Sequence, residues 1–169
     1  MPKPLSLSKP FPQVEGISND ARTLGIISPA YASSTGELNA TLQYVYHSFF
    51  FRKCNKPEIA EKLLSIAIAE MHHLDLLGQT ILALGAPPVY CSNPYSMFNF
   101  YNTKFVAYSR SLREMIEDDI LGERHAIASY SRMLAKLKNE RVKEIISRIS
   151  EDEKLHLETL EQILTELKG

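Results

Sequence analysis

The sequence contains two copies of a Glu-x-x-His motif, Glu70 to His73 and Glu153 to His156. In an α-helix, residues three apart lie on the same face, one turn from each other along the axis. A carboxylate and an imidazole at this spacing can bind one metal ion together. We therefore predict that each motif lies in a helix and supplies two metal ligands.

Each motif follows a single glutamate at a similar distance. Glu37 lies 33 residues before Glu70, and Glu123 lies 30 residues before Glu153. In an antiparallel pair of helices, residues at equal distances from the turn lie at the same level. The spacing thus predicts that four glutamates and two histidines meet at one level of a helical bundle.

The same spacing predicts where the helices turn. The midpoints fall near residues 53 and 138, where short polar segments separate long segments with helical apolar periodicity. A long connection at about 86–108 can run the length of the bundle and set the helices on either side of it parallel. Helices are expected at about 28–52, 58–84, 109–137 and 140–167.

We predict an all-α four-helix bundle over residues 28–169, with up-down-down-up topology and a long crossover between helices 2 and 3. Residues 1–27 precede it, and prolines and a glycine in their first part cannot sustain a helix. We expect this N-terminal arm to be disordered or to wrap a neighbouring subunit. The crossover is rich in aromatic residues, which we expect to pack on the bundle or on a partner: Tyr90, Tyr95, Phe98, Phe100, Tyr101, Phe105 and Tyr108.

Two tyrosines repeat the spacing of the single glutamates. Tyr44 lies seven residues after Glu37, and Tyr130 lies seven residues after Glu123. Seven residues are close to two helical turns, so each tyrosine lies on the face of its glutamate and should project into the bundle. We predict that both are catalytic residues that relay a proton or an electron.

Other residues of these helices are expected to lie elsewhere. In the first helix, Leu38, Leu42, Val45 and Phe49 recur at intervals of three and four, which predicts an apolar stripe facing the core. His72 and His125 each point about 200° away from a predicted ligand and are expected off the site.

Four carboxylates in a bundle core repel one another and lose hydration unless positive charge compensates them. Lysine and arginine are missing from the matching helical positions, whereas two divalent cations would balance the four negative charges. Oxygen-rich ligands with few imidazoles favour iron or manganese. Two such ions with open positions suit redox chemistry on peroxide or dioxygen. Asp152 could accept the second ring N–H of His73, but Ala69 at the equivalent position gives His156 no such partner.

The length, charge and hydropathy of the sequence limit the classes of protein to which the chain can belong. A chain of 169 residues suits one bundle domain, and a net charge of -1 gives no basic field for nucleic acid. No apolar segment is long enough to span a membrane, and the first residues lack the apolar core of a signal peptide. We expect a cytoplasmic protein without nucleic-acid or membrane partners, and free thiols at Cys54 and Cys91.

The ligand types and their order resemble the ferritin-like di-metal carboxylate superfamily, over about residues 28–167. The resemblance implies that Glu70 and Glu153 bridge two metal ions, that Glu37 and Glu123 are terminal ligands, and that each ion binds one imidazole. It also implies a homodimer or a larger homo-oligomer.

Within the superfamily, the bundle looks like that of rubrerythrin, a peroxide-reducing protein, which the paired tyrosines suit. The two cysteines cannot form rubrerythrin's rubredoxin iron domain, so an external electron donor would be required. The chain also resembles bacterioferritin, in which a methionine at the place of Met71 binds haem; we do not expect haem here. Manganese catalase is a more distant relative, because its fourth helix typically lacks a bridging glutamate like Glu153. The expected function is a dinuclear iron or manganese oxidoreductase; a ferroxidase for iron storage and a metal-binding scaffold without turnover are the alternatives.

Overall fold

The computed structural model describes residues 1–95 and 99–167. This part of the chain is helical, apart from loops and an isolated bridge between Cys91 and Phe100. The helices are α1 (Ala21–Ala32), α2 (Glu37–Lys53), α3 (Pro57–Ala83), the short 3-10 helix η1 (Thr103–Phe105), α4 (Leu112–Lys136) and α5 (Glu140–Glu166). The all-α prediction is confirmed, and α3, α4 and α5 begin and end close to the expected residues.

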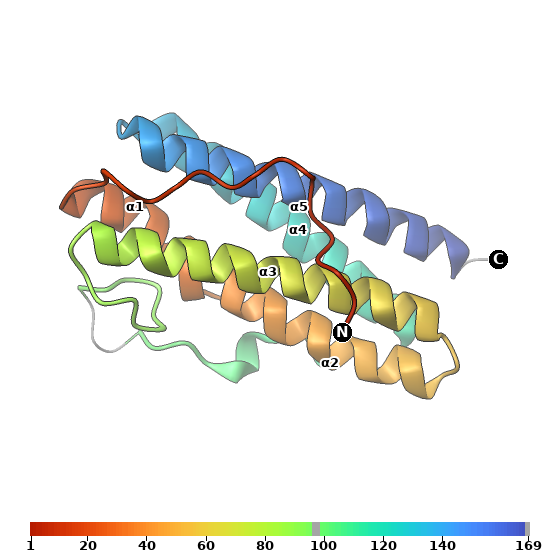
Figure 1. Ribbon diagram of the computed structural model, residues 1–169. Coiled ribbons are helices and arrows are strands. Elements are labelled where there is room, and N and C mark those ends of the chain that lie inside the picture. Colours follow the sequence, from red (N-terminus) through yellow and green to blue (C-terminus); the bar gives the residue numbers. More distant parts are fainter. Residues whose placement is uncertain (96–98, 168–169) are drawn as a thin grey trace.

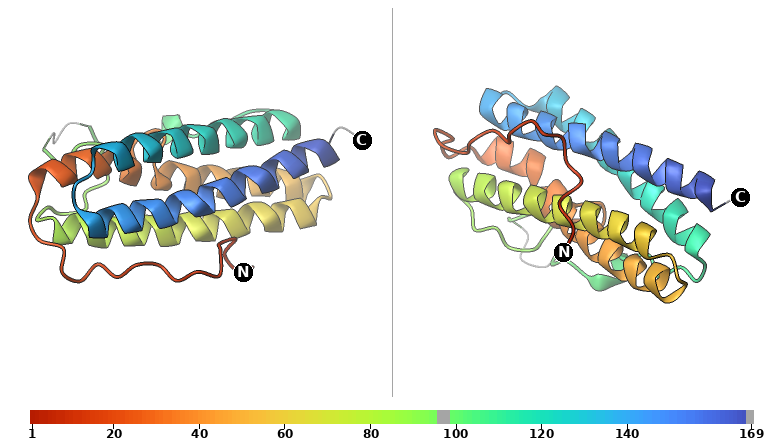
Figure 2. Two further views of the ribbon diagram at one scale, coloured as in Figure 1. Left: turned by 90° about the horizontal axis from the view of Figure 1, so that it is seen from above. Right: turned by 45° about the vertical axis from the view of Figure 1, so that its right-hand side comes forward.

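Helices α2 to α5 form the predicted four-helix bundle (Figure 1). α2 and α5 run in one direction and α3 and α4 in the other, which is the up-down-down-up order (Figures 1 and 2). The connection between α3 and α4 returns along the bundle, as its length predicted. The two hairpins, α2 with α3 and α4 with α5, each contribute half of the predicted ligands.

The predicted first helix over 28–52 is wrong in its N-terminal part. A separate helix, α1, begins at Ala21, because the Asp20 side chain accepts hydrogen bonds from two backbone N–H groups of its first turn. Pro29 lies inside α1 and not at the start of a helix. Residues 21–27 of the predicted arm are therefore helical, and the extended part ends at Asp20.

The break between α1 and α2 depends on Gly36. A Cβ atom at this position would lie 2.6 Å from the backbone oxygen of Ala30, so a side chain fits only if the backbone moves. Gly36 thus allows the end of α1 to lie against the start of α2. The close approach places Glu37, the first residue of α2, at the level of the other glutamates.

The buried face of α2 differs from the predicted apolar stripe. Leu42 and Phe49 are 37% and 56% exposed, whereas Thr41, Tyr44 and Phe51 are buried. The buried positions still recur at intervals of three and four, but the side chains on that face are mostly polar. The helix is therefore oriented by the need to bring Glu37 and Tyr44 inside, and not by its apolar residues.

Apolar side chains fill the bundle on both sides of the polar level. One cluster gathers near α1 and includes Ile27, Leu77, Val142, Ile145 and Ile149. The other gathers at the opposite end and includes Phe51, Leu63, Ile66, Ile116, Leu160 and Ile163. The glutamates and histidines lie between two dry clusters, where an uncompensated charge is expensive.

The N-terminal arm lies on its own chain, so the prediction of a disordered or neighbour-wrapping arm is wrong. It runs along α3 and α5 (Figures 1 and 2). The backbone N–H of Leu5 donates to the oxygen of Ser65 in α3 at 2.9 Å, and Lys9 Nζ lies 3.0 Å from Glu151 Oε1 in α5. The arm therefore contacts both of these helices.

Some aromatic residues of the crossover contact the helices, as expected, but most of these rings stay exposed: Tyr90, Tyr95, Phe100, Phe105 and Tyr108. The ring of Tyr90 stacks on Tyr31 with 5.6 Å between centroids, and the ring of Tyr108 meets Tyr46 edge-on at 4.9 Å. Phe98 lies outside the described residues.

Cys54 is exposed and Cys91 is buried, and both are free thiols, as predicted. None of the helices in residues 1–95 and 99–167 combines the length and apolarity needed to cross a bilayer.

Candidate metal centre

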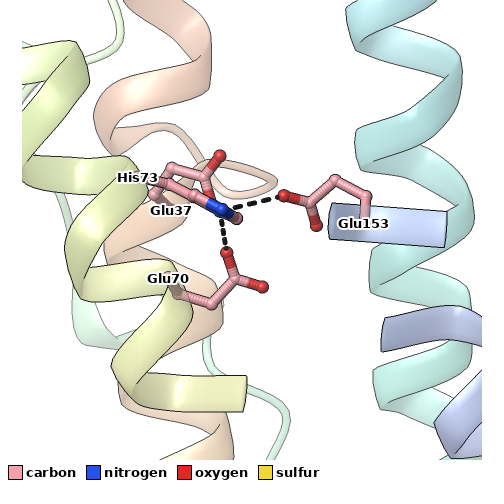
Figure 3. Close-up of side chains that lie close together, drawn as sticks. All are labelled: Glu37, Glu70, His73 and Glu153. Atoms are coloured by element: carbon pink, nitrogen blue, oxygen red, sulfur yellow. Dashed lines mark hydrogen bonds and ion pairs between the residues drawn. The ribbon is translucent and has the colours of Figure 1, made fainter. Parts of the chain in front are cut away.

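The six residues predicted as metal ligands lie together in the centre of the bundle, and all six are buried. They form two groups whose ligand atoms lie within 4.8 Å of one another, and each group has one histidine. Glu70 and Glu153 belong to both groups, which places them between two potential ion positions. The first group consists of Glu37, Glu70, His73 and Glu153 (Figure 3), and the second of Glu70, Glu123, Glu153 and His156.

In the first group, the Nδ1 atom of His73 faces the carboxylates. It lies 2.9 Å from Glu70 Oε2, 3.1 Å from Glu153 Oε1 and 3.9 Å from Glu37 Oε2. Three helices thus bring their side chains around one imidazole nitrogen (Figure 3).

The second group has the same form. Nδ1 of His156 lies 3.1 Å from Glu70 Oε1, 3.6 Å from Glu123 Oε1 and 3.7 Å from Glu153 Oε2. The two imidazole rings face each other with centroids 5.9 Å apart. The repeated sequence pattern therefore becomes an approximate two-fold arrangement of side chains.

The two predicted tyrosines cross between the hairpins. The hydroxyl of Tyr44 donates to Glu123, and the hydroxyl of Tyr130 donates to Glu37. Burial, and then the charge of Glu123, raise the pKa of Tyr44 well above its ordinary value. A phenol that stays protonated can hold its glutamate in place as a hydrogen-bond donor.

Burial and mutual charge shift the pKa values of the site residues in opposite directions. Burial and then neighbouring carboxylates raise the pKa of Glu37 and Glu123 well above the ordinary value. Burial lowers the pKa of His73 and His156, but nearby carboxylates outweigh it and raise both well above the ordinary value. Burial raises the pKa of Glu70, and the two histidines outweigh it, so that this pKa is lowered. The raised pKa values of Glu37, Glu123 and both histidines all favour bound protons, which oppose the negative charge of the site.

Several site atoms lack the partners that buried polar atoms ordinarily have. Among the described residues, Glu70 Oε1, Glu153 Oε1 and His156 Nδ1 are buried without a hydrogen-bond partner. Glu70 Oε1 and His156 Nδ1 lie 3.1 Å apart, and Glu153 Oε1 lies 3.1 Å from His73 Nδ1, so all three atoms face other ligands of the site. Carboxylate oxygens and imidazole nitrogens are ligands that iron and manganese accept, so the residues present fit a dinuclear centre.

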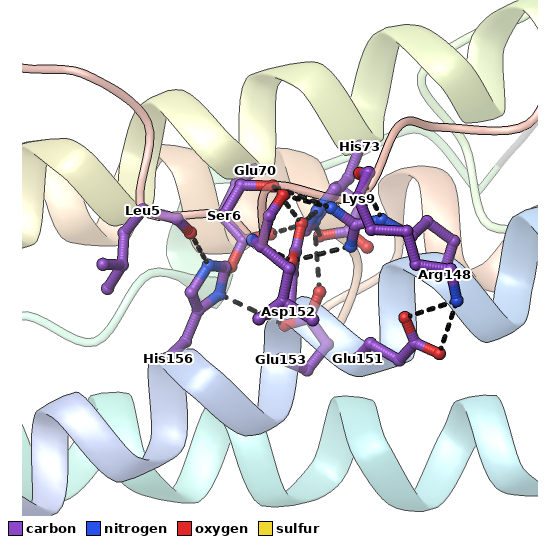
Figure 4. A network of polar contacts seen from close by, with 12 residues as sticks. Leu5, Ser6, Lys9, Glu70, His73, Arg148, Glu151, Asp152, Glu153 and His156 are labelled. Carbon is purple, nitrogen blue, oxygen red and sulfur yellow. Dashed lines mark hydrogen bonds and ion pairs between the residues drawn. The ribbon is translucent and has the colours of Figure 1, made fainter.

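The outer nitrogens of the two imidazoles have different partners. His73 Nε2 lies 3.2 Å from Asp152 Oδ2, the contact that the sequence indicated. His156 was expected to lack a partner, but its Nε2 lies 2.8 Å from the backbone oxygen of Leu5 in the arm. Both rings are therefore held with Nε2 outward and Nδ1 toward the carboxylates (Figure 4).

A cavity of about 180 Å³ connects the site with the surface between α2 and α4. Glu37, Tyr44, Glu123 and Glu153 are among its inner residues, and Phe105 of the crossover is among those that line it. The site is thus reachable by a small molecule from this side.

A buried polar network beside the site was missed by the sequence analysis. His47 Nδ1 lies 2.9 Å from Asp119 Oδ1, and Gln43 Nε2 donates to the same oxygen at 2.8 Å. The network continues to Ala107 of the crossover, whose N–H donates to Gln43 Oε1 and whose oxygen lies 2.9 Å from His47 Nε2. Asp119 lies one turn before Glu123, a spacing that could have drawn attention to it.

The residues expected off the site are exposed. His72 and His125 are on the surface, and Met71 is 41% exposed. His125 still borders the mouth of the cavity.

Comparisons with known proteins agree with the geometry. The family model of the ferritin-like domain matches residues 33–169. No curated protein matches the chain. Two crystal structures of KatB, a manganese catalase from Anabaena, one of them from strain PCC7120, overlay with a TM-score of 0.82 at 20% identity, covering 96% of this chain and 80% of the other.

A further solved structure is bacterioferritin from Rhodobacter capsulatus with a metal-free dinuclear site and haem iron. It has a TM-score of 0.70 and 24% identity, and the match covers 88% of this chain and 86% of the other. At such identities these likenesses concern the fold. Together with the family match over most of the sequence, they show that the chain belongs to the ferritin-like family.

Proposed function

We propose that this chain is a dinuclear iron or manganese oxidoreductase that acts on peroxide or dioxygen. The observation that carries the proposal is the pair of overlapping ligand groups, in which Glu70 and Glu153 are shared and each group has one histidine. A cavity leads to these residues from the surface, and buried atoms without partners favour cations at this place.

The proposed ligands are Glu37, Glu70 and His73 for one ion and Glu123, Glu153 and His156 for the other, with Glu70 and Glu153 bridging. When bound, two iron or manganese ions would supply a change of two electrons at positions open to the oxidant. Apolar clusters close the bundle on both sides of the site along its axis, so the cavity between α2 and α4 is the route to the two positions.

Tyr44 and Tyr130 are the proposed catalytic residues. Each hydroxyl donates to the terminal glutamate of the opposite hairpin, so a proton can pass from the phenol to the carboxylate or return. Tyr44 also lines the cavity by which an oxidant would enter. Reduction of peroxide to two waters consumes two electrons and two protons, and an external electron donor would supply the electrons.

Two other reactions of dinuclear centres are alternatives to the reduction of peroxide. Disproportionation of peroxide into water and dioxygen needs no donor, and the Anabaena protein of similar fold is a manganese catalase. Oxidation of ferrous iron is favoured by Asp118, whose carboxylate lies among the residues of the cavity and would attract an entering cation. In the ferroxidase case the chain would assemble into a large shell, and in the oxidoreductase case into a homodimer or larger homo-oligomer.

The test begins with protein loaded with iron or, separately, manganese, and with metal content measured per chain. Peroxide consumption with a chemical reductant, dioxygen release without one, and ferrous oxidation then separate the three reactions. We expect about two ions per chain and reductant-dependent peroxide consumption. Glu70→Gln keeps the size of the side chain and should lose both, whereas Glu58→Gln, an exposed change in the first turn of α3, should lose neither. Turnover unchanged in Glu70→Gln would refute the proposal.

A further inference from the structure

The N-terminal arm touches the outer side of both histidines of the proposed centre. Figure 4 shows Leu5, Ser6 and Lys9 of the arm beside His156, Asp152 and Arg148 of α5. The prolines of the arm predicted an extended segment, but nothing in its sequence indicated contact with the site. Its contacts are made largely by backbone atoms.

On the His156 side the contact is direct. The oxygen of Leu5 lies 2.8 Å from His156 Nε2, and a carbonyl oxygen can only accept, so Nε2 must carry the proton. In the neutral ring, which is the form that binds a cation, Nδ1 then has its lone pair toward Glu70 and Glu123. The N–H of Leu5 donates to Ser65 in α3 at 2.9 Å, which fixes the carbonyl from the other side.

On the His73 side the arm acts through Asp152. One oxygen of this buried carboxylate lies 3.2 Å from His73 Nε2 and accepts from the hydroxyl of Ser6 at 2.6 Å; the other accepts from the N–H of Leu7 at 2.9 Å. These bonds orient the carboxylate toward the imidazole. Metal-binding histidines commonly donate their second N–H to such a partner, which fixes the tautomer and makes the ligand more basic.

Arg148 ties the arm to α5. Its guanidinium is buried and donates to the oxygen of Leu7 at 2.9 Å, the hydroxyl of Ser6 at 3.0 Å and the oxygen of Lys9 at 3.0 Å. It also pairs with Asp152 Oδ1 at 2.7 Å. A charged side chain enclosed in this way is satisfied only while the arm is in place.

We propose that Leu5, Ser6 and Leu7 are positioning residues of the dinuclear centre, so that docking of the arm and binding of the metal ions reinforce each other. This inference rests on the proposed metal site. The arm keeps both imidazoles in the tautomer whose Nδ1 binds a cation. The two halves also differ, because His73 has a carboxylate partner and His156 a neutral carbonyl.

The experiment compares two truncations by Mn(II) titration, with free Mn(II) followed by electron paramagnetic resonance. Deletion of residues 1–8 removes all three positioning residues, and deletion of residues 1–3 is the matched control that keeps them. We expect the longer deletion to weaken Mn(II) binding about 10- to 100-fold, the range that loss of such partners produces. The shorter deletion should bind as the full chain does.

A loss caused by general unfolding is distinguished by two further measurements. Ser6→Ala removes one donor to Asp152 and should weaken Mn(II) binding several-fold, whereas Ser8→Ala, an exposed neighbour, should not. Nitrogen-15 spectra of the metal-free protein, recorded at a pH at which the His156 ring is neutral, should show the proton on Nε2 in the full chain and a mixture of tautomers after the longer deletion. A merely structural role of the arm would not change this tautomer in a folded bundle.

The outcomes separate the two proposals. If the full chain binds no Mn(II) or iron, both the proposed function and the role of the arm are refuted. If the full chain binds two ions and the deletion of residues 1–8 binds them as tightly, with the same His156 tautomer, the role of the arm alone is refuted.

Discussion

The hydroxyl of Tyr44 in α2 donates a hydrogen bond to Glu123 in α4, the single glutamate of the opposite hairpin. Tyr130 and Glu37 repeat the contact in the other direction. Each tyrosine therefore holds the terminal carboxylate that the opposite hairpin gives to the site. The two hairpins are coupled at the level of the proposed ions, and not only through their apolar clusters.

Loss of this contact should affect turnover more than metal binding. We expect Tyr44→Phe to lower kcat about 100-fold, the scale of a lost proton-transfer group, while about two ions per chain are retained. Tyr130→Phe should behave similarly because of the approximate symmetry. Tyr46→Phe, in the same helix but outside the site, is the control. Steady-state kinetics with metal analysis checks the prediction, and full turnover in both variants would contradict it.

Uptake of metal should release protons. Glu37, Glu123, His73 and His156 all have a raised pKa, so up to four protons must leave before two cations bind. Mn(II) affinity should consequently rise with pH above the ordinary pKa values of 4.5 for the glutamates and 6.5 for the histidines. Titration in weak and strong buffers, with the released protons measured by calorimetry, checks this. Affinity that does not depend on pH would show that the protons lie elsewhere.

The metal-free protein should show the opposite trend in stability. A group whose pKa is raised on folding stabilises the fold at low pH and loses this contribution as the pH rises toward the folded value. For the two glutamates the loss begins above their ordinary pKa of 4.5, and for the two histidines above 6.5. Glu70 and Asp152, with lowered pKa values, have gained their full contribution by about pH 6. We expect the Tm of the metal-free protein to fall from pH 6 to pH 9, and metal to abolish the fall.

Gly36 should be intolerant of a side chain. In Gly36→Ala the new Cβ would meet the backbone oxygen of Ala30 at 2.6 Å, so α1 and the start of α2 must separate. We expect a loss of about 1–3 kcal/mol in the free energy of unfolding and weaker metal binding, because Glu37 moves. Gly25→Ala, where nothing lies within 4 Å, should be neutral or stabilising in the helix. Urea unfolding of both variants gives the comparison.

The pair of His47 and Asp119 should matter for stability. Both side chains are buried and 2.9 Å apart, and Asp119→Ala would leave His47 and Gln43 without their shared acceptor. A loss of about 3 kcal/mol is expected from breaking a buried pair. Glu117→Ala breaks the exposed pair with Arg113 and should change stability by less than about 1 kcal/mol. A double-mutant cycle with His47→Ala isolates the coupling between the two residues.

The sequence was sufficient for the bundle and for the meeting of six polar side chains. The reason is physical: Glu70 and His73 are constrained by helical periodicity, and the levels of Glu37 and Glu123 follow from hairpin symmetry. The contact of Asp152 with His73 could be predicted in the same way, because it follows from the position of Asp152 next to Glu153 in the second copy of the motif.

Features that depend on packing between distant segments could not be predicted. The arm binds through backbone atoms such as the oxygen of Leu5, and such atoms leave no pattern in a sequence. The contact of His47 with Asp119 depends on how α2 packs against α4. The apolar periodicity of α2 predicted that Leu42 and Phe49 face the core, but both are exposed. The face of α2 that carries Glu37 and Tyr44 is buried instead.

The centre differs in access on its two sides. The cavity between α2 and α4 opens one side to the surface, and the arm covers the side formed by α3 and α5. An oxidant that escapes before it is consumed would leave through the open side only. Over many turnovers, oxidative modification should accumulate on His125 and Phe105 at that opening. Phe11 of the arm should be spared, although its ring lies 5.8 Å from that of His73. The positions of the modified residues would thus show by which side the oxidant leaves the site, and oxidative damage would be confined to that face of the protein.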